Sequence, residues 1–332
     1  STLQQEASRL LNFSTQKTMR VAQQLYEGVE IKGKGSIGLI SYLRTDSTRI
    51  SEEADKAVRE YIRKNYGEKY EAAPTSEDKT GKKIQDAHEA IRPTDSSLNP
   101  AAVKASLSRE QFRLYQLIWN RFLASRMCPA VYETLSVKAE CGGCIFTASA
   151  SNLLFEGFMM IYTSDDEKAE KSAALSGLEK GMKPECESVE PLQHFTQPPA
   201  HYTEAALVHT LEELGIGRPS TYAPTITTIM QRRYITKEKK NLYITELGEA
   251  VNSMMKKAFP SIVDVNFTAN LEGLLDCVGE GTVNWKTVLK NFWPDLVAAV
   301  ETAEKELENV TIEDEKTDVI CEKCGRNMVI KY

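Results

Sequence analysis

The chain has 332 residues, of which 41% are hydrophobic and 27% are charged, with a formal net charge of −6 at pH 7. This length and apolar content predict two or three domains. The acidic balance excludes a uniformly basic nucleic-acid binder, so a DNA site requires segregated charge. Lys and Arg are in excess over 1–128 and 201–260, whereas acids gather over 165–190 and 301–318. No apolar run approaches the ~20 residues of a membrane span, and seven scattered cysteines suit a reducing cytosol.

The first third of the chain predicts a helical unit with a small β element. Apolar spacing indicates one helix over 2–26, after which Gly33-Lys34-Gly35 breaks into a strand that leads to Tyr42. Ser51 is the expected N-cap of a second helix that stops before Gly67. After a polar loop over 71–86, the sequence Ser108-Arg109-Glu110-Gln111 is a capping box that opens a further helix.

The most informative stretch is the segment from Ser41 to Arg49, SYLRTDSTR, which places Tyr42 two residues before Arg44. A strand end followed by the turn-forming residues 45–48 presents a side chain openly. Forming phenolate at neutral pH costs about 4 kcal/mol, and a nearby guanidinium offsets this cost and clamps a phosphate. The alternative interpretation is a strand tyrosine beside a solvated arginine.

Beyond residue 130 the pattern changes to alternation. Residues 131–149 predict β-sheet with a hairpin turn at Gly142-Gly143, and 165–190 is an acidic loop. A helix over 203–214, a second over 220–232 and a basic hairpin over 234–244 make a winged-helix pattern. Two more helices are expected near 267–278 and 285–309.

Four blocks, in order, resemble the type IA DNA topoisomerases, specifically bacterial topoisomerase I. They are GLISYLRTDSTR from Gly38 to Arg49, AHEAIRPT from Ala87 to Thr94, the pair YTEAAL from Tyr202 with GIGRPSTYA from Gly215, and Phe267-Thr268-Ala269 followed by Trp285. Enzymes of this family begin with a Toprim domain, whose cluster of acidic residues binds magnesium. The Asp-x-Asp motif after a strand that would mark this cluster does not occur in the sequence. Both ends therefore look cut, and we expect an internal fragment of a larger enzyme.

The resemblance implies a multidomain, mainly α fold with a β-rich arch, which is an arc of the family's torus without Toprim. We expect a helical catalytic-tyrosine domain over 1–128 and part of the arch over 129–200. A helical, winged-helix-like domain that grips single-stranded DNA follows over 201–310, and residues 311–332 form a linker and the start of a truncated zinc ribbon.

The resemblance makes Tyr42 the nucleophile, with Arg44 and His88 stabilising phosphoryl transfer. Asp46 and Arg92 are second-tier catalytic candidates. Taken alone, a histidine such as His88 is more often structural, and Arg92 has the alternative role of a surface arginine in a salt bridge. Asp46 either caps the turn after Tyr42 or orients Arg44 or His88.

The DNA-binding candidates are Arg218, Arg232, Thr221 and Tyr222. Arg218 stands between a glycine-rich turn and a helix N-terminus, where backbone N–H groups and the helix dipole favour a phosphate. Tyr222 is expected either to stack on a base or to lie in the core. Together with Arg232 at the end of the following helix, these residues predict the path of a DNA strand toward the active site.

Two Cys-x-x-Cys pairs have different expected roles. Cys141 and Cys144 flank the hairpin turn and are neighbours through chain geometry alone. Cys321 and Cys324, followed by Gly325, resemble the first half of a Cys₄ zinc ribbon. Zinc binding then needs residues beyond Tyr332, and magnesium binding needs the missing Toprim domain in cis.

The resemblance implies that the chain is part of an isomerase, a type IA DNA topoisomerase. One strand is cleaved through a 5′-phosphotyrosyl intermediate, the other strand passes, and the nick is resealed, which relaxes negative supercoils without ATP. The expected partners are single-stranded and negatively supercoiled DNA, with no membrane, in the bacterial cytoplasm at the nucleoid. We expect the fragment alone to lack relaxation activity. The rival hypothesis is a non-catalytic single-stranded DNA-binding module in which Tyr42 is structural.

Overall fold

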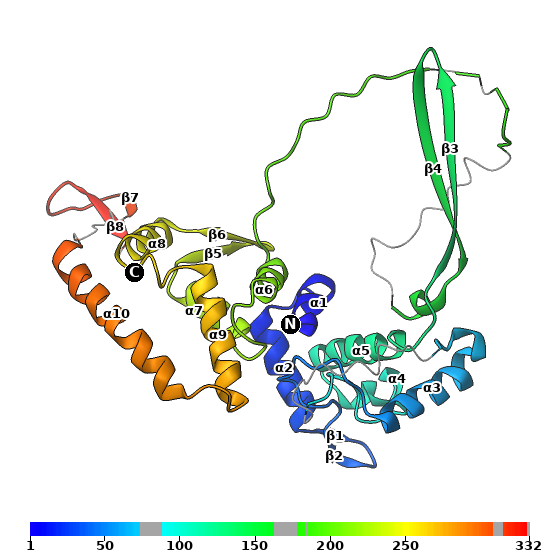
Figure 1. Ribbon diagram of the computed structural model, residues 1–332, viewed down its shortest axis with the longest axis horizontal. Helices are drawn as coiled ribbons and strands as arrows, with labels where there is room; N and C mark the ends of the chain where they lie inside the picture. The colour runs from blue at the N-terminus through cyan, green and yellow to red at the C-terminus, as the bar shows by residue number, and fades with distance from the viewer. Residues whose placement is uncertain (74–87, 163–177, 184, 187, 308–314, 331–332) are drawn as a thin grey trace. The chain divides into compact units, whose positions relative to one another are not determined.

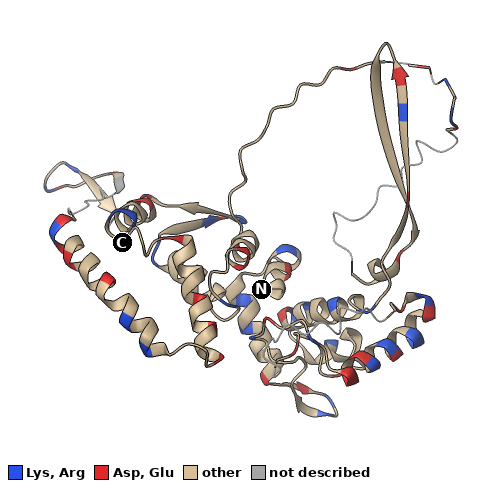
Figure 2. Ribbon diagram, viewed as in Figure 1, with Lys and Arg blue, Asp and Glu red and all other residues tan. Residues whose placement is uncertain are grey.

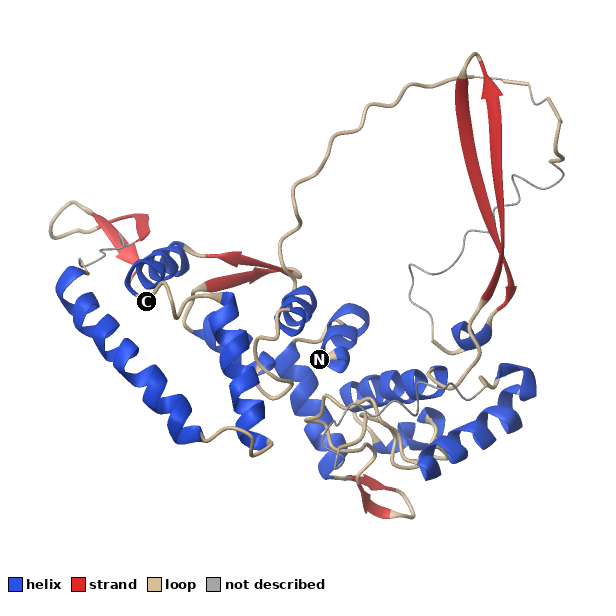
Figure 3. Ribbon diagram, viewed as in Figure 1, coloured by secondary structure: helices blue, strands red, loops and turns tan. Residues whose placement is uncertain are grey.

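A computed structural model describes residues 1–73, 88–162, 178–183, 185–186, 188–307 and 315–330. The chain forms two compact units, Thr2–Ala200 and His201–Tyr332. Helices dominate both units, and every sheet in the described ranges is a two-stranded hairpin (Figure 3). No helix in these ranges is long and apolar enough to cross a membrane.

The first helix is shorter than predicted, because the expected helix over 2–26 is two helices. α1 is Thr2–Leu11 and α2 is Thr15–Glu27. Asn12 has a φ of 56°, and the Ser14 hydroxyl accepts a hydrogen bond from the backbone N–H of Lys17 at 3.1 Å. A left-handed residue followed by an N-cap ends one helix and starts the next. The apolar stripe continued through this break, so apolar spacing alone did not reveal it.

Two further helices of the first unit begin where the caps predicted. Ser51 caps α3 (Glu52–Tyr66) and Gly67 ends it, while Ser108 and Gln111 form both bonds of the capping box that opens α5 (Arg109–Ala124). The 3₁₀ turn η1 (Glu68–Tyr70) follows α3, and α4 (Pro100–Val103) and η3 (Lys104–Ser106) precede α5. The predicted loop over 71–86 lies mostly outside the described residues.

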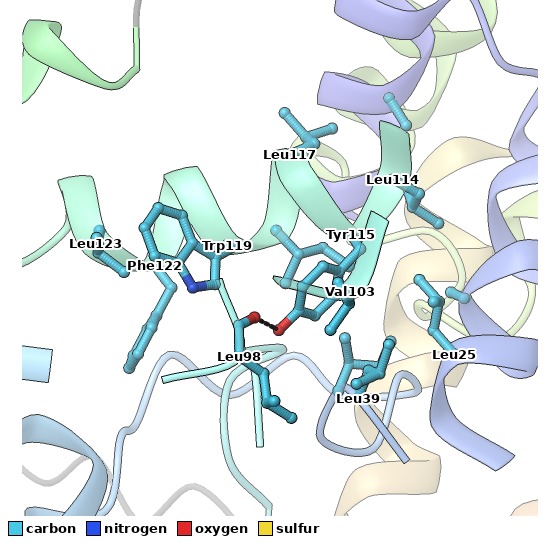
Figure 4. Packing of buried hydrophobic residues seen from close by; sticks show 14 of the residues in the cluster. Leu25, Leu39, Leu98, Val103, Leu114, Tyr115, Leu117, Trp119, Phe122 and Leu123 are labelled. Atoms are coloured by element: carbon cyan, nitrogen blue, oxygen red, sulfur yellow. Dashed lines mark hydrogen bonds between the residues drawn. The ribbon is translucent and has the colours of Figure 1, made fainter. Parts of the chain in front are cut away.

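The core of the first unit is built on one face of α5. Leu114, Tyr115 and Leu123 are fully buried, and they pack with Leu25 of α2 and with Leu39, which lies just ahead of Tyr42 (Figure 4). The Tyr115 hydroxyl donates a hydrogen bond to the Leu98 carbonyl at 2.6 Å. The segment that carries Tyr42 therefore starts inside the core.

A network of ion pairs and hydrogen bonds connects α3 to two other segments of the first unit. The two Asp55 carboxylate oxygens accept hydrogen bonds from Arg59 at 2.6 Å and from Arg126 at 2.5 Å, and Arg59 also donates to the Ala72 carbonyl. Burial disfavours the ionised form, but the two arginines outweigh it and lower the pKa of Asp55. Figure 2 shows α3 with acidic and basic residues along its length. The network joins α3 to the chain at residues 72 and 126.

Two hairpins complete the first unit. β1 (Val29–Ile31) pairs with β2 (Gly35–Ile37), and β3 (Val131–Cys141) pairs with β4 (Cys144–Phe155), turning at Gly142 and Gly143 with φ of 59° and 78° as the Gly-Gly turn predicted. The expected β-rich arch is thus represented in the described residues by one long hairpin (Figure 1). The 3₁₀ turn η4 (Gly157–Met160) follows it.

In its middle, over 134–139 and 146–151, the β3–β4 hairpin has one apolar and one polar face. Its register pairs Leu135 with Ala150, Val137 with Ala148 and Ala139 with Phe146 on one face, while Thr134–Ser151, Ser136–Ser149 and Lys138–Thr147 share the other.

The second unit opens with the predicted helix, turn, helix and hairpin. α6 (Glu204–Glu213) and α7 (Tyr222–Gln231) precede β5 (Ile235–Glu238) and β6 (Asn241–Ile244). Thr203 bridges Asn241, and the buried Glu204 carboxylate pairs with Lys237 at 2.6 Å. Backbone and ion-pair contacts therefore fix the hairpin to the start of α6.

Three helices and a final hairpin follow. α8 (Glu246–Ala258) was missed by the sequence reading although Thr245 caps it. α9 (Val265–Gly279) and α10 (Trp285–Glu306) match the two expected helices, with residues 308–309 of the second outside the described ranges. β7 (Glu315–Ile320) and β8 (Asn327–Ile330) enclose Cys321 and Cys324.

Candidate active site and strand-binding site

Tyr42 lies on an extended segment whose side chains alternate between core and solvent. β2 ends at Ile37, an isolated bridge joins Ile40 to Pro93, and the chain then runs on without a strand, so Tyr42 follows the strand less directly than predicted. The buried side chains are Leu43, Thr45 and Ser47, and the exposed ones are Tyr42, Arg44, Asp46 and Thr48. Tyr42 and Arg44 are therefore both exposed to solvent, with Tyr42 42% exposed.

Ser41 ties this segment to the one that carries His88. Its backbone N–H donates to the Arg92 carbonyl at 2.9 Å, and its hydroxyl donates to the Ala90 carbonyl at 2.7 Å. The same hydroxyl accepts from the backbone N–H of Arg92 at 2.9 Å. The Arg49 carbonyl accepts from the Ala90 N–H at 2.8 Å. Two segments about 50 residues apart in sequence are thus held together on both sides of Tyr42.

The Tyr42 ring is flanked by two aromatic rings. The His88 ring lies 6.1 Å away between centroids with the planes 21° apart, and Tyr26 meets Tyr42 edge-on at 5.4 Å. Tyr26 belongs to the last turn of α2, and a Cβ at Gly38 would lie 2.6 Å from its carbonyl oxygen. Only glycine permits this approach, which brings the end of α2 beside the tyrosine.

The turn after Tyr42 is capped by hydroxyl groups. Thr45 Oγ1 accepts from the Ser47 N–H at 3.0 Å, and Ser47 Oγ accepts from the Arg49 N–H at 3.2 Å. These bonds take the capping role that was one of the two expectations for Asp46. Within the described residues, neither Asp46 nor Arg44 forms an ion pair or side-chain hydrogen bond.

Arg92 is engaged by its own segment. Its Nε and Nη2 atoms contact Glu89 Oε2 at 2.9 and 2.7 Å, and its Nη1 donates to the Pro93 carbonyl at 3.0 Å. The side chain is mostly buried. This geometry matches the salt-bridging alternative that the sequence left open. Arg92 therefore holds together the segment from His88 to Pro93, called the His88 loop below.

Sequence reasoning missed three members of this site: Tyr26, Ser41 and Glu89. Ser41 and Glu89 lie inside the recognised motifs, but their contacts span from 3 to 51 residues of sequence and needed the fold. Tyr26 carried one usable signal. It ends a helix just ahead of a tight hairpin that returns the chain to the tyrosine.

In the second unit, Arg218 begins the turn into α7. Its Nη2 donates to Asp276 Oδ2 at 2.6 Å, its Nη1 donates to the Gly217 carbonyl at 2.7 Å, and Glu272 Oε2 lies 3.7 Å from Nη1. Burial disfavours the charged guanidinium, but Asp276 and Glu272 outweigh it and raise the pKa of Arg218. The Thr221 hydroxyl accepts from the Arg218 N–H at 2.9 Å and so shapes the turn.

The other two candidates of this group differ in exposure. Tyr222 is only 5% exposed and packs with Val208 and Ile226, so it takes the core role among its two expected roles. Arg232 is exposed at the C-terminal cap of α7. A base has no access to the Tyr222 ring in this conformation, whereas a phosphate can reach Arg232.

Cys321 and Cys324 form a compact knuckle. The Gly325 N–H donates to the Cys321 carbonyl at 2.8 Å, and the Cys321 N–H donates to the Arg326 carbonyl at 2.8 Å. Backbone N–H groups of Lys323 and Cys324 point at the Cys321 sulfur and lower the pKa of its thiol. Cys141 and Cys144 are paired across the β3–β4 turn and exposed, as expected from chain geometry.

No group of three or more His, Cys, Asp or Glu side chains able to hold a metal ion occurs in the described parts of the chain. The structure thus brings the Tyr42 and His88 rings together and leaves Arg44 exposed two residues after Tyr42.

The motif blocks around Tyr42 resemble those of DNA topoisomerases, and comparison with known proteins shows the family of the chain. The family model for DNA topoisomerase (Topoisom_bac) matches residues 1–290, and the chain belongs to this family of bacterial type IA enzymes. The chain is also similar to a solved structure, full-length topoisomerase I from Thermotoga maritima. The identity is 35% and the TM-score 0.78, covering 99% of this chain and 56% of that one. The chain thus spans little more than half the length of that relative.

Proposed function

We propose that this chain supplies the nucleophile and part of the strand-binding surface of a type IA topoisomerase. The observation that carries the proposal is the exposed Tyr42 two residues before the exposed Arg44, with the His88 ring 6.1 Å from the tyrosine ring between centroids. A nucleophile must be exposed to meet a DNA backbone, and Tyr42 is.

In the proposed reaction the Tyr42 hydroxyl oxygen attacks a phosphodiester phosphorus of a single strand. An O–P bond to tyrosine forms, the P–O3′ bond breaks, and the departing 3′ oxygen takes up a proton to become a hydroxyl. The 5′-phosphotyrosyl link stores the bond energy, so the 3′ hydroxyl can reverse the step after the other strand has passed. Neither ATP nor a net change of bonds is needed.

Arg44 and His88 are proposed to stabilise the charge of this step. A guanidinium holds two phosphate oxygens in a fork and favours the phenolate, and an imidazole donates a proton or a hydrogen bond near neutral pH. Arg44 is exposed beside the tyrosine and makes no competing ion pair in the described part. Asp46 is also exposed and remains a second-tier candidate. Arg92 is proposed to act indirectly, by holding the segment from His88 to Pro93 in place.

The two metals implied by the family fit this chain differently. The described residues offer no carboxylate set for magnesium, so we assign no step to that ion here and propose that a Toprim segment supplies its ligands. Cys321 and Cys324 fit zinc as two of the four thiolates that a ribbon needs. The backbone N–H groups that point at the Cys321 sulfur favour its thiolate form.

For the strand path we propose Arg218, Thr221 and Arg232 as contacts to single-stranded DNA. Arg218 and Thr221 lie at the start of α7, where the helix dipole favours a phosphate, and Arg232 is exposed at its end. The buried Tyr222 supports the wall of this surface without stacking on a base.

The test is a covalent-adduct assay in a full-length topoisomerase I that carries this chain. A labelled single strand is incubated with the enzyme and quenched in detergent, and the adduct is resolved by electrophoresis. Tyr42→Phe should abolish the adduct while leaving strand binding within a few-fold, and Tyr61→Phe serves as the matched control at a tyrosine outside the site. An adduct that survives Tyr42→Phe would refute the assignment and favour the non-catalytic binding module. The isolated chain should not relax supercoiled DNA, and robust magnesium-dependent relaxation by it would contradict our placement of the metal ligands.

A further inference from the structure

The Arg218 guanidinium, proposed above to meet a DNA phosphate, already has an anionic partner within its own unit. Its Nη2 lies 2.6 Å from Asp276 Oδ2, and its Nη1 lies 3.7 Å from Glu272 Oε2. Both carboxylates come from α9 and are four residues apart, so they lie on the same face of that helix. A phosphate can reach this arginine only in competition with them.

The two carboxylates are not equivalent. The Glu272 side chain is 22% exposed and sits at the longer distance, whereas the Asp276 side chain is 61% exposed and makes the shorter contact. An exposed ion pair exchanges its partner at little cost because water solvates the released carboxylate. A sheltered carboxylate is harder to displace and is better suited to hold the guanidinium in place.

We propose that Asp276 is a resident counter-ion that a DNA phosphate displaces from Arg218, while Glu272 keeps the guanidinium oriented. Asp276 thereby regulates the strand site, since it lowers affinity for single strands and prevents Arg218 from holding other anions tightly. The inference rests on the proposed strand contact of Arg218.

The exchange predicts a definite effect of removing one charge. Asp276→Asn leaves Arg218 without its exposed partner and removes a negative charge beside the strand. Single-strand affinity should then rise roughly two- to fivefold at low salt, the range expected when one exposed ion pair is lost. Because the removed repulsion is screened by salt, the gain should shrink as salt rises, and the plot of log K against log salt should become steeper.

The experiment measures binding of a dye-labelled single strand to the 332-residue chain by fluorescence anisotropy at several salt concentrations. The variants are Asp276→Asn, Arg218→Ala and the double variant. Asp295→Asn on α10 is the control, because it changes the net charge equally at another exposed carboxylate. Thermal melts establish that each variant is folded.

The expected result is tighter binding by Asp276→Asn, no change in Asp295→Asn, and no gain from Asp276→Asn in the Arg218→Ala background. That last comparison is a double-mutant cycle that isolates the coupling between the two side chains. Weaker binding by Asp276→Asn would overturn the proposal and make Asp276 a positioning residue. An equal gain in affinity with or without Arg218 would also overturn it, because the gain would then come from the change in net charge and not from the loss of the ion pair.

Failure of the inference is distinguishable from failure of the proposed strand path. If Arg218→Ala weakens binding but Asp276→Asn changes nothing, the counter-ion role is wrong and the strand contact stands. If Arg218→Ala itself leaves affinity and salt slope unchanged, the strand contact at Arg218 is wrong and the counter-ion role falls with it.

Discussion

Replacing Ser41 by alanine is expected to weaken both the first unit and its chemistry, because one hydroxyl joins the Tyr42 segment to the His88 loop. The hydroxyl donates to the Ala90 carbonyl at 2.7 Å and accepts from the Arg92 N–H at 2.9 Å, in a partly buried position. Its loss leaves a donor and an acceptor unpaired where water has limited access.

The cost follows from these two groups. An unpaired buried polar group costs about 1–3 kcal/mol, and partial access of water places Ser41→Ala toward the lower end of that range. For a unit of this size each kcal/mol lowers Tm by roughly 2–4 °C. In the full-length enzyme the rate of adduct formation should fall more than strand affinity does, because the two hydrogen bonds of Ser41 position the segment that carries the nucleophile.

Thermal unfolding of the 332-residue chain measures the first effect, and single-turnover adduct formation measures the second. Ser41→Thr keeps the hydroxyl and should restore most of both. Ser36→Ala, at an exposed position of β2, is the control for replacement of a nearby serine. An unchanged Tm together with an unchanged adduct rate in Ser41→Ala would refute the reasoning that this hydroxyl assembles the site.

Three further predictions concern the neighbouring charges and rings. Arg44→Ala should slow adduct formation by orders of magnitude and Arg44→Lys should recover little of it, since an ammonium cannot form the forked contact; timed detergent quenches would show this. The pKa of Asp55 is lowered in the folded state, so its stabilisation is present above its unfolded pKa of about 4 and is lost as pH falls through the folded value. As pH falls, the Tm of Asp55→Asn should decrease less steeply than the Tm of the wild type. Parallel curves of Tm against pH would contradict the role assigned to Asp55. Tyr26→Phe should keep the adduct rate and Tyr26→Leu should lower it, unless the edge-on ring has no positioning role, in which case both variants match the wild type.

Local signals in the sequence predicted the elements well where a cap or a turn fixed them. Ser51, the Ser108 capping box and the Gly142-Gly143 turn each act within four residues, and each appears as expected. The wrong helix over 2–26 also had a local cause. Asn12 and Ser14 end and restart the helix, but the apolar stripe runs across them and predicts one continuous helix. Thr245 was the local signal for α8, which was not predicted.

The contacts that build the sites were beyond local reading. The motif blocks indicated that Tyr42, Arg44 and His88 belong together, but no periodicity shows that a serine hydroxyl bonds a loop 51 residues away. Likewise, the turn chemistry at Arg218 favoured a phosphate, while its carboxylate partner lies 58 residues later in α9. Such pairs are set by tertiary packing, and a single sequence contains no pattern that specifies them.

The two arginines proposed to contact DNA differ in their ion pairs within the described residues. Arg44 forms none with those residues, so we expect a phosphate to meet it without displacing one of their carboxylates. Arg218 is neutralised by Asp276 until an anion replaces that carboxylate. Unpaired charge suits a group that must stabilise a transient phosphoryl centre, whereas paired charge suits a surface along which a strand must bind and later leave. Substitution of Arg44 should therefore act mainly on the rate of adduct formation, and substitution at Arg218 or Asp276 mainly on affinity and its salt dependence.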